Sequence, residues 1–150
     1  DGTYEDAIMG IDAGATVVTH FNNAMSKISE SGKTFSTAVL EDTRIALELI
    51  CDGVHVPSEV VRQLFEKAPD RVILVSDAMS GAGSADGSYT IGGLEVEVRD
   101  GVARLRSNGA LAGSTLILRK AADIAIGMGV SLKNVNRAIS TSPIAFLANR

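Results

Sequence analysis

Two histidines and one aspartate are the side chains of this chain best suited to carry chemistry. His20, His55 and Asp77 each follow a short run of apolar residues, and Asn22 and Asn23 next to His20 could donate amide hydrogen bonds to a polar ligand. A neutral imidazole is the commonest metal ligand and can act as a general base. A carboxylate at the end of a buried segment needs a partner or a metal, and it can accept a proton from metal-bound water. Together they predict a metal-assisted hydrolase or lyase.

Simpler interpretations exist for each of these residues and for their neighbours. A single histidine is often structural, and Asp77 could be a helix cap or a turn residue. Asp52 is typical of a turn in which the carboxylate accepts bonds from its own backbone. Cys51 is expected to be a buried strand residue and not a nucleophile. Residues 80–87 are rich in glycine but lack the lysine of a phosphate-binding loop, so they predict a flap or a linker.

The elements that must position these side chains alternate along the chain. Apolar, β-branched runs predict strands at residues 15–19, 44–50 and 71–76, while helical spacing predicts helices at 3–13 and 57–68. This alternation is typical of an α/β protein with a parallel sheet. Parallel strands bring their carboxyl ends to one edge, so the three candidate residues are expected to meet there.

The second half of the chain has a different pattern. Residues 86–107 predict a small β-hairpin insert, because Gly92-Gly93 and Asp100-Gly101 are turn sequences between short extended segments. Three further helices are expected to begin at cap or proline residues: Ser114, Ser131 and Pro143.

The amino-acid composition excludes several classes of protein for this chain. The chain has 150 residues, 45% hydrophobic and 21% charged, which is enough for one folded domain. A net charge of −4 argues against a nucleic-acid partner, and no run of about 18 apolar residues predicts a membrane span. The single cysteine fits a reducing cytoplasm, and the acidic first residues do not resemble a signal peptide. Because the first residue is not Met, we expect a piece of a longer chain.

Four short sequences, in order along the chain, carry a family resemblance: Thr19-His20-Phe21-Asn22-Asn23-Ala24-Met25, Asp52-Gly53-Val54-His55-Val56, Val75-Ser76-Asp77-Ala78 and Leu111-Ala112-Gly113-Ser114. This set resembles the N-acetylglucosamine-6-phosphate deacetylases of the amidohydrolase superfamily. The resemblance implies a partial (β/α)8 TIM barrel of the metal-dependent amidohydrolase type. Residues 1–150 would be the C-terminal part of the barrel domain, roughly its last three strands, with residues 86–107 inserted. The upstream half of the barrel and a closing β-sandwich would be absent.

The resemblance also implies a reaction and the residues that perform it. The family hydrolyses the acetamide of N-acetylglucosamine 6-phosphate to glucosamine 6-phosphate and acetate, with a divalent metal ion such as zinc or iron. By resemblance, His20 would be a metal ligand and Asp77 the general base that later protonates the leaving amine. His55 would contact the substrate and help polarise the amide carbonyl.

Further residues are implied to bind the amino-sugar phosphate. Asn23 and the backbone of Ala24 would hold the sugar phosphate, while Leu111 and Gly113 would line the acetyl side of the pocket. The family's phosphate-binding arginine has no counterpart, which leaves Lys33 as its candidate replacement. The resemblance further implies a cytoplasmic homodimer.

Two alternatives to a deacetylase remain open: a non-catalytic structural fragment and a different metal-dependent amidohydrolase. The family's other metal ligands, a Glu of an upstream Glu-Gly-Pro motif and a His of a Gly-His segment, are not among these residues. The fragment alone is therefore expected to be inactive, and it could be a non-catalytic structural piece. The missing arginine leaves room for another metal-dependent amidohydrolase with a non-phosphorylated substrate.

Overall fold

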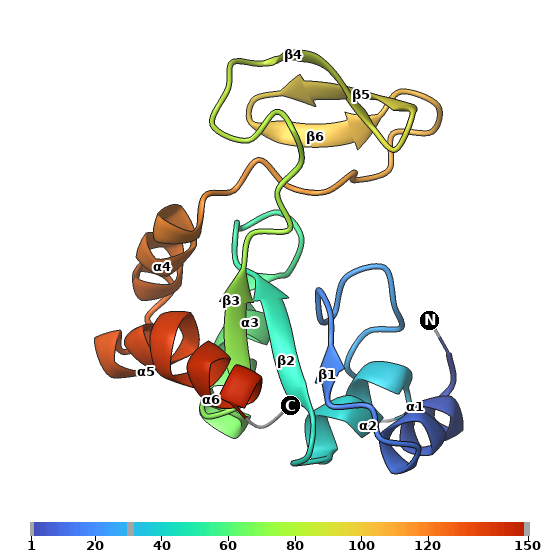
Figure 1. Ribbon diagram of the computed structural model, residues 1–150, viewed down its shortest axis with the longest axis vertical. Helices are drawn as coiled ribbons and strands as arrows, with labels where there is room; N and C mark the ends of the chain where they lie inside the picture. The colour runs from blue at the N-terminus through green and yellow to red at the C-terminus, as the bar shows by residue number, and fades with distance from the viewer. Residues whose placement is uncertain (1, 30–31, 149–150) are drawn as a thin grey trace.

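The computed structural model describes residues 2–29 and 32–148 and contains two sheets, one above the other in Figure 1. The lower sheet is parallel, and its strands lie side by side in chain order. These strands are β1 (Val17–Val18), β2 (Ala46–Ile50) and β3 (Val72–Val75). An α/β fold with a parallel sheet is therefore confirmed. Strands that neighbour each other in chain order are typical of barrel segments.

Helices precede and connect the parallel strands. They are α1 (Tyr4–Asp12), α2 (Phe35–Glu41) and α3 (Ser58–Lys67). Thr3 caps α1 in a reciprocal capping box with Asp6, as the sequence indicates. The sequence pattern did not reveal α2, which begins after Thr34, whose hydroxyl accepts a bond from the Thr37 N–H at 3.1 Å.

The strands are shorter than the apolar runs predict. Only Val17 and Val18 of residues 15–19 pair with β2. In the central strand, Leu47 and Leu49 are fully buried, whereas Ala46 and Glu48 are only partly buried. The two faces of β2 therefore differ in burial over its first four residues, whereas Ile50 at its end is buried as well.

Arg71 ties the start of β3 to the end of α2. Its guanidinium donates to the backbone oxygens of Asp42 at 2.7 Å, Ile45 at 2.9 Å and Leu40 at 2.5 Å, and to that of Val39 at 3.3 Å. These carbonyls lie at or just beyond the C-terminus of α2, where carbonyl groups lack helical partners and a positive charge is favourable. Arg71 therefore acts as a clamp between two consecutive β/α units.

The upper sheet is antiparallel and has a small core of its own, including Val96, Val98 and Ala103. Its strands are β4 (Gly87–Ile91), β5 (Leu94–Arg99) and β6 (Val102–Leu105). Both predicted turn sequences are used, so the expected small β-hairpin insert is a three-stranded sheet. Asp100 and Gly101 both adopt positive φ, which matches the turn that closes a tight hairpin.

The remaining helices are α4 (Leu118–Gly127), α5 (Leu132–Asn136) and α6 (Ser142–Ala148), the last two joined by a π-helical turn, η1 (Arg137–Thr141). The expected helix start at Ser114 is wrong, because Ile117 occupies the N-cap position. Ser131 caps α5 as predicted, through the Asn134 N–H at 3.2 Å.

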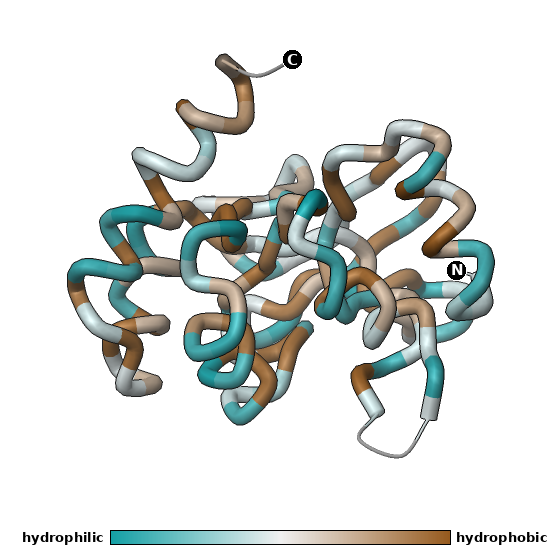
Figure 2. Tube along the Cα trace, turned by 90° about the horizontal axis from the view of Figure 1, so that it is seen from below, coloured by the Kyte–Doolittle hydropathy of each residue, from teal (hydrophilic) through white to brown (hydrophobic). Residues whose placement is uncertain are grey.

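The last helix leaves apolar side chains exposed. Ile144 and Leu147 on α6 are each about two-thirds exposed, and Figure 2 shows this helix projecting from the rest of the molecule. None of the helices within residues 2–29 and 32–148 combines the length and apolar character needed to cross a membrane.

Candidate functional site

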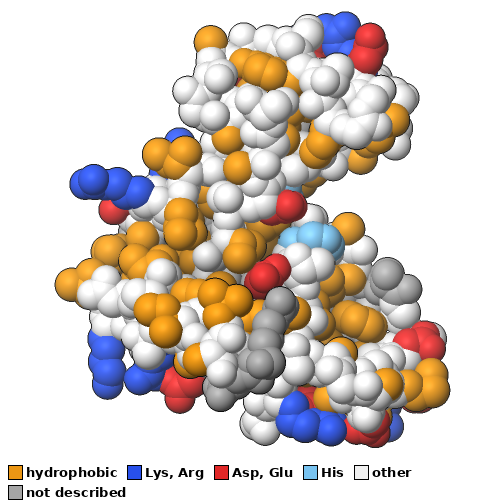
Figure 3. Space-filling view, viewed as in Figure 1, with side chains coloured by type: hydrophobic (Ala, Val, Ile, Leu, Met, Phe, Trp, Pro, Cys, Tyr) orange, Lys and Arg blue, Asp and Glu red, His pale blue; other side chains and the backbone are white. Residues whose placement is uncertain are grey.

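The three candidate residues follow the carboxyl ends of three adjacent parallel strands. His20 comes after β1, His55 lies in the loop after β2, and Asp77 follows β3. Figure 3 shows histidine and acidic side chains at the narrow region between the two sheets. The fold therefore places the three residues at one edge of the sheet, which is where α/β proteins build their sites.

The backbone is strained at this edge. His20, Asn22, Ala24 and Asp77 have φ values of +36°, +63°, +50° and +48°. Left-handed backbone costs a non-glycine residue about 1–2 kcal/mol. Such strain persists where the surrounding structure imposes it, and it clusters at functional sites. Among the described residues, only Asp100 in the β5–β6 turn is a further non-glycine case.

His20 is partly buried and its ring is held by its own loop. The Phe21 N–H donates to the backbone oxygen of Glu48 in β2 at 2.6 Å, which ties the loop to the sheet. The Nδ1 atom of His20 lies 3.2 Å from the backbone oxygen of Asn23. A carbonyl can only accept, so Nδ1 carries a proton in this contact, and Nε2 is the nitrogen left to bind a ligand.

The two asparagines after His20 have different surroundings. Asn22 is buried, and its side-chain oxygen accepts from the Ile28 N–H at 3.3 Å, so it holds the loop together. Asn23 is partly buried and Ala24 is exposed. Of the two amides, Asn23 is the one placed to reach a ligand.

Two lysines lie near this loop. Lys33, the expected replacement for the phosphate-binding arginine, has its ammonium 5.1 Å from the centre of the Tyr4 ring on α1. Lys27, which the sequence analysis did not single out, donates to the backbone oxygen of Asn22. Lys27 therefore places a positive charge directly on the loop that contains Asn23.

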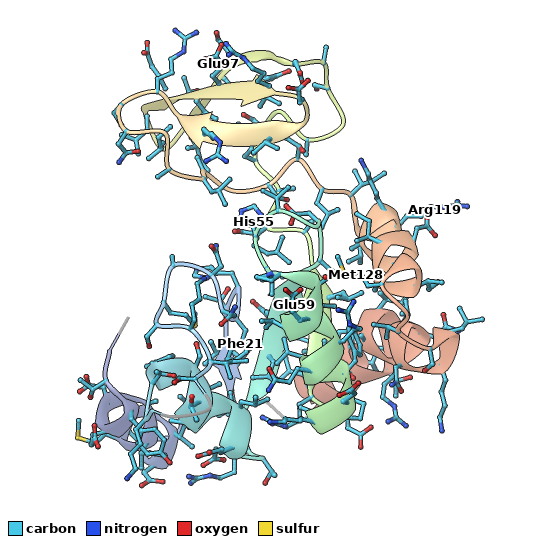
Figure 4. All side chains as sticks on the ribbon, turned by 180° about the vertical axis from the view of Figure 1, so that it is seen from behind. Phe21, His55, Glu59, Glu97, Arg119 and Met128 are labelled. Atoms are coloured by element: carbon cyan, nitrogen blue, oxygen red, sulfur yellow. The ribbon has the colours of Figure 1, made fainter. Side chains whose placement is uncertain are left out.

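His55 is paired with Asp52. Its Nδ1 atom lies 2.6 Å from Oδ2 of Asp52, and the side chains are 3% and 13% exposed. Oδ1 of Asp52 accepts the backbone N–H groups of Val54 and His55 at 2.8 and 2.9 Å, as a turn aspartate is expected to do. Burial raises the pKa of Asp52, but the bonds from His55 and the two N–H groups outweigh it, so the pKa is lowered overall. Figure 4 shows His55 between the two sheets.

Asp77 is exposed, and its backbone is held by the turn that contains Gly113. The Ser114 N–H donates to the Asp77 oxygen at 2.8 Å, and the Met79 N–H donates to the Ser114 oxygen at 2.9 Å. The Ser114 hydroxyl, in place of capping a helix, donates to the backbone oxygen of Ser76. Leu111 belongs to the same turn and bridges to Arg104 of β6. The structure thus brings Asp77 together with residues 111–114.

Gly113 is needed where this turn approaches Asp77. Its φ is +62°, and a Cβ would stand 3.2 Å from both the Asp77 oxygen and the Met79 Cβ. We expect Gly113→Ala to destabilise the protein by about 2–4 kcal/mol, since left-handed strain and overpacking add. Gly109→Ala is the matched control, because Gly109 has φ of +73° and open space around it. Urea unfolding measures both, and equal losses would contradict a close approach to Asp77.

Cys51 is not a candidate for the chemistry. The side chain is 1% exposed, and burial together with the negative charge of Asp52 raises the pKa of the thiol to about 11. A thiol in this state is a poor nucleophile and a poor metal ligand. Cys51 is buried as expected, but it follows the last residue of β2 and does not lie in the strand.

A complete metal centre is not formed by residues 2–29 and 32–148 alone. No three His, Cys, Asp or Glu side chains in that part of the chain come together as ligands. A catalytic divalent metal takes about three protein ligands, so the residues present do not fit such an ion by themselves. At most, His20 supplies one ligand.

A cavity lies at the opposite end of the strands, away from the histidines and Asp77. It has a volume of about 270 Å³ and is lined by residues near the strand starts, including Thr16, Ala46 and Ile73, and by Phe146 of α6. In parallel α/β folds, functional sites form at the carboxyl ends of the strands, whereas residues at the amino ends mainly contribute to stability. The histidines and Asp77 do not contribute to this cavity.

Comparison with known proteins places these features in one family. No family model matches the chain. It is 38% identical to the N-acetylgalactosamine-6-phosphate deacetylase of Escherichia coli O157:H7 over 91% of its length, and 34% identical to the N-acetylglucosamine-6-phosphate deacetylase of Vibrio furnissii over 79%. The chain spans 35% and 29% of these two relatives. It is also 40% identical to a protein of Escherichia coli K12 provisionally named an N-acetylgalactosamine-6-phosphate deacetylase, and it covers 68% of that protein.

Solved structures show the same relationship. A variant of the N-acetyl-D-glucosamine-6-phosphate deacetylase of Mycobacterium smegmatis, solved with N-acetyl-D-glucosamine 6-phosphate, matches 98% of the chain with a TM-score of 0.92 and 35% identity. The enzyme of Thermotoga maritima matches 99% with a TM-score of 0.89 and 34% identity. The chain covers 40% and 41% of these structures. With its sequence motifs and fold in agreement, the chain belongs to the family of N-acetylglucosamine- and N-acetylgalactosamine-6-phosphate deacetylases.

Proposed function

We propose that the whole protein hydrolyses the acetamide of N-acetylglucosamine 6-phosphate to glucosamine 6-phosphate and acetate. The observation that carries this proposal is the placement of His20, His55 and Asp77 after three adjacent parallel strands, at a strained edge of the sheet. Family membership supports the substrate class. The proposal extends to a homodimer in the cytoplasm, as the resemblance implies.

Asp77 and His55 have separate roles in the proposed reaction. Asp77 accepts a proton from the attacking water as the new C–O bond forms at the amide carbon. It then returns the proton to nitrogen as the C–N bond breaks, so the amine leaves neutral. His55 contacts the amide carbonyl through Nε2, because Nδ1 is bonded to Asp52.

A divalent metal would lower the pKa of water and polarise the amide when bound. His20 is the one ligand that we propose from this chain, through the Nε2 atom that its contact with Asn23 leaves available. The other ligands lie outside the residues described here, so we assign no step of the reaction to the metal.

The sugar phosphate is proposed to lie against the loop after β1. Asn23 and the backbone of Ala24 hold it, and the charge of Lys27 on the same loop favours an anion there. Leu111 and Gly113 line the acetyl side, because their turn is bonded to the backbone of Asp77.

N-Acetylgalactosamine 6-phosphate is the second candidate substrate. The relatives that are 38% and 40% identical to the chain carry this name. The two sugars differ in the configuration at one ring carbon, while the acetamide and the phosphate are shared. A non-phosphorylated substrate is not favoured, because the named relatives act on amino-sugar phosphates.

The test is acetate release by the whole protein from three compounds: N-acetylglucosamine 6-phosphate, N-acetylgalactosamine 6-phosphate and N-acetylglucosamine. We expect release from a phosphorylated sugar, a much lower kcat/KM without the phosphate, and loss of activity with a chelator that metal restores. No release by a folded, metal-loaded protein from either phosphate would contradict the proposal. Faster release from the galactosamine compound would select the second candidate.

A further inference from the structure

Asp52 uses its two oxygens for different contacts. Oδ1 accepts the backbone N–H groups of Val54 and His55 and so shapes the loop after β2. Oδ2 contacts only the His55 ring among the bonds of the described residues, at 2.6 Å from Nδ1. The loop and the ring are therefore held by one carboxylate, but through separate atoms.

The contact with Oδ2 decides which nitrogen of His55 carries the proton. The pKa of Asp52 is lowered, so the carboxylate is ionised at neutral pH and can only accept hydrogen bonds. Nδ1 must then be protonated, which leaves Nε2 as the nitrogen that can interact outside the pair. Nε2 accepts when the ring is neutral and donates when the ring is an imidazolium.

Burial makes this arrangement rigid. The His55 side chain is 3% exposed, and Cys51 and Val56, on either side of it in the chain, are each 1% exposed. The ring therefore has little room to rotate away from Asp52. Only a ring protonated on both nitrogens can keep the contact with Asp52 and also donate from Nε2 to a carbonyl oxygen.

We propose that Asp52 is a positioning residue for the deacetylation, which fixes the orientation and the proton position of His55 so that Nε2 meets the amide carbonyl. This proposal rests on the proposed function, because it assigns a partner to His55 in that reaction. Asp52 itself does not touch the substrate in this scheme. Its effect reaches the reaction only through the imidazole.

Asp52→Asn is the decisive variant, because it removes the oxygen that contacts the His55 ring and keeps an oxygen for the backbone bonds. The asparagine oxygen still accepts the N–H groups of Val54 and His55, so the turn is retained. Its NH2 group replaces Oδ2 and opposes a protonated Nδ1, which favours the tautomer with the proton on Nε2. Nε2 of the variant can then donate only from a neutral ring, and a bond without the positive charge is weaker, so we expect kcat of the whole protein to fall about 10-fold or more with a small change in KM.

Asp6→Asn is the matched control. Asp6 also accepts backbone and hydroxyl bonds, at the start of α1, and it has no histidine partner. We expect this variant to keep the wild-type kcat. Asp52→Ala removes both oxygens, so it should lower both kcat and the melting temperature, whereas Asp52→Asn should lower kcat with little change in the melting temperature.

The second readout is the NMR spectrum of protein with ¹⁵N-labelled histidine, with the His55 signals assigned by their loss in His55→Gln. We expect Nδ1 to carry a proton in the wild type and to lose it in Asp52→Asn. Unchanged His55 signals together with unchanged kcat would overturn the proposal, and so would changed signals with a wild-type kcat. If the wild type released no acetate, the deacetylase function would fail, and unchanged His55 signals would still refute the role of Asp52.

Discussion

Replacing Asp77 by Asn is expected to lower kcat for acetate release from N-acetylglucosamine 6-phosphate by about 10²–10⁴-fold, the usual contribution of a general acid–base group. Asparagine has nearly the same shape but cannot accept the proton of the attacking water. The fold should be retained, because asparagine tolerates the left-handed backbone that Asp77 adopts at φ of +48°. Steady-state kinetics of the whole protein give the measurement, and circular dichroism checks the fold.

Asp100→Asn is the control for this prediction. Asp100 is also exposed and left-handed, with φ of +52°, but it belongs to the β5–β6 turn. We expect its kcat to stay near the wild-type value. An Asp77→Asn protein with full activity would exclude Asp77 as the proton acceptor. A similar loss in both variants would indicate a general effect of the substitution.

Replacing Arg71 by Met is expected to reduce the free energy of unfolding by about 3 kcal/mol or more. The guanidinium donates to four backbone oxygens around the end of α2, and methionine leaves them without these donors. A hydrogen bond to a charged group contributes about 1.5–3 kcal/mol, and water can replace part of this at a half-buried residue. Urea unfolding of the whole protein measures the loss.

Arg71→Lys tests the geometry of this clamp. Lysine keeps the positive charge near the helix C-terminus but has a single ammonium in place of the planar fork. We expect an intermediate loss of stability. If Arg71→Met unfolds at the wild-type urea concentration, the four contacts do not stabilise the fold. If Arg71→Lys is as unstable as Arg71→Met, the planar guanidinium and its several donors stabilise the fold, and the positive charge alone does not.

The sequence was most informative where local chemistry decides the structure. The runs before His20 and Asp77 are short, apolar and β-branched, so strands were evident, and their parallel order placed both residues at one edge. Thr3 and Ser131 cap helices through bonds within a few residues of themselves, which a sequence pattern can express. The turn sequences of the antiparallel sheet are local signals of the same kind.

Long-range contacts explain what could not be read from the sequence. Ser114 has the chemistry of a cap, but its hydroxyl bonds to Ser76, far away in the chain. The helix α2 has only seven residues, too few for a clear apolar period, and it depends on packing and on the distant Arg71. The roles of His20, Asn23 and Leu111 stay predictions, because each is defined by a contact with the metal ion or the substrate and not by a contact within the chain.

Asp52 shows why a correct local interpretation can be incomplete. The turn that the sequence indicated is present, with Oδ1 bonded to the backbone of Val54 and His55. The second oxygen meets the His55 ring, and the motif places the two residues close enough for this contact. The signal was therefore present in the spacing of Asp52 and His55, but only the ring orientation reveals it.

The left-handed backbone at His20, Ala24 and Asp77 also has a consequence for protein engineering. Glycine at such positions relaxes the chain, so laboratory selection for heat resistance alone would favour it there. The same changes would loosen or remove groups that the reaction is proposed to need. Directed evolution of this protein should therefore screen activity and thermal resistance together, and the strand-end loops are where the two goals are expected to conflict.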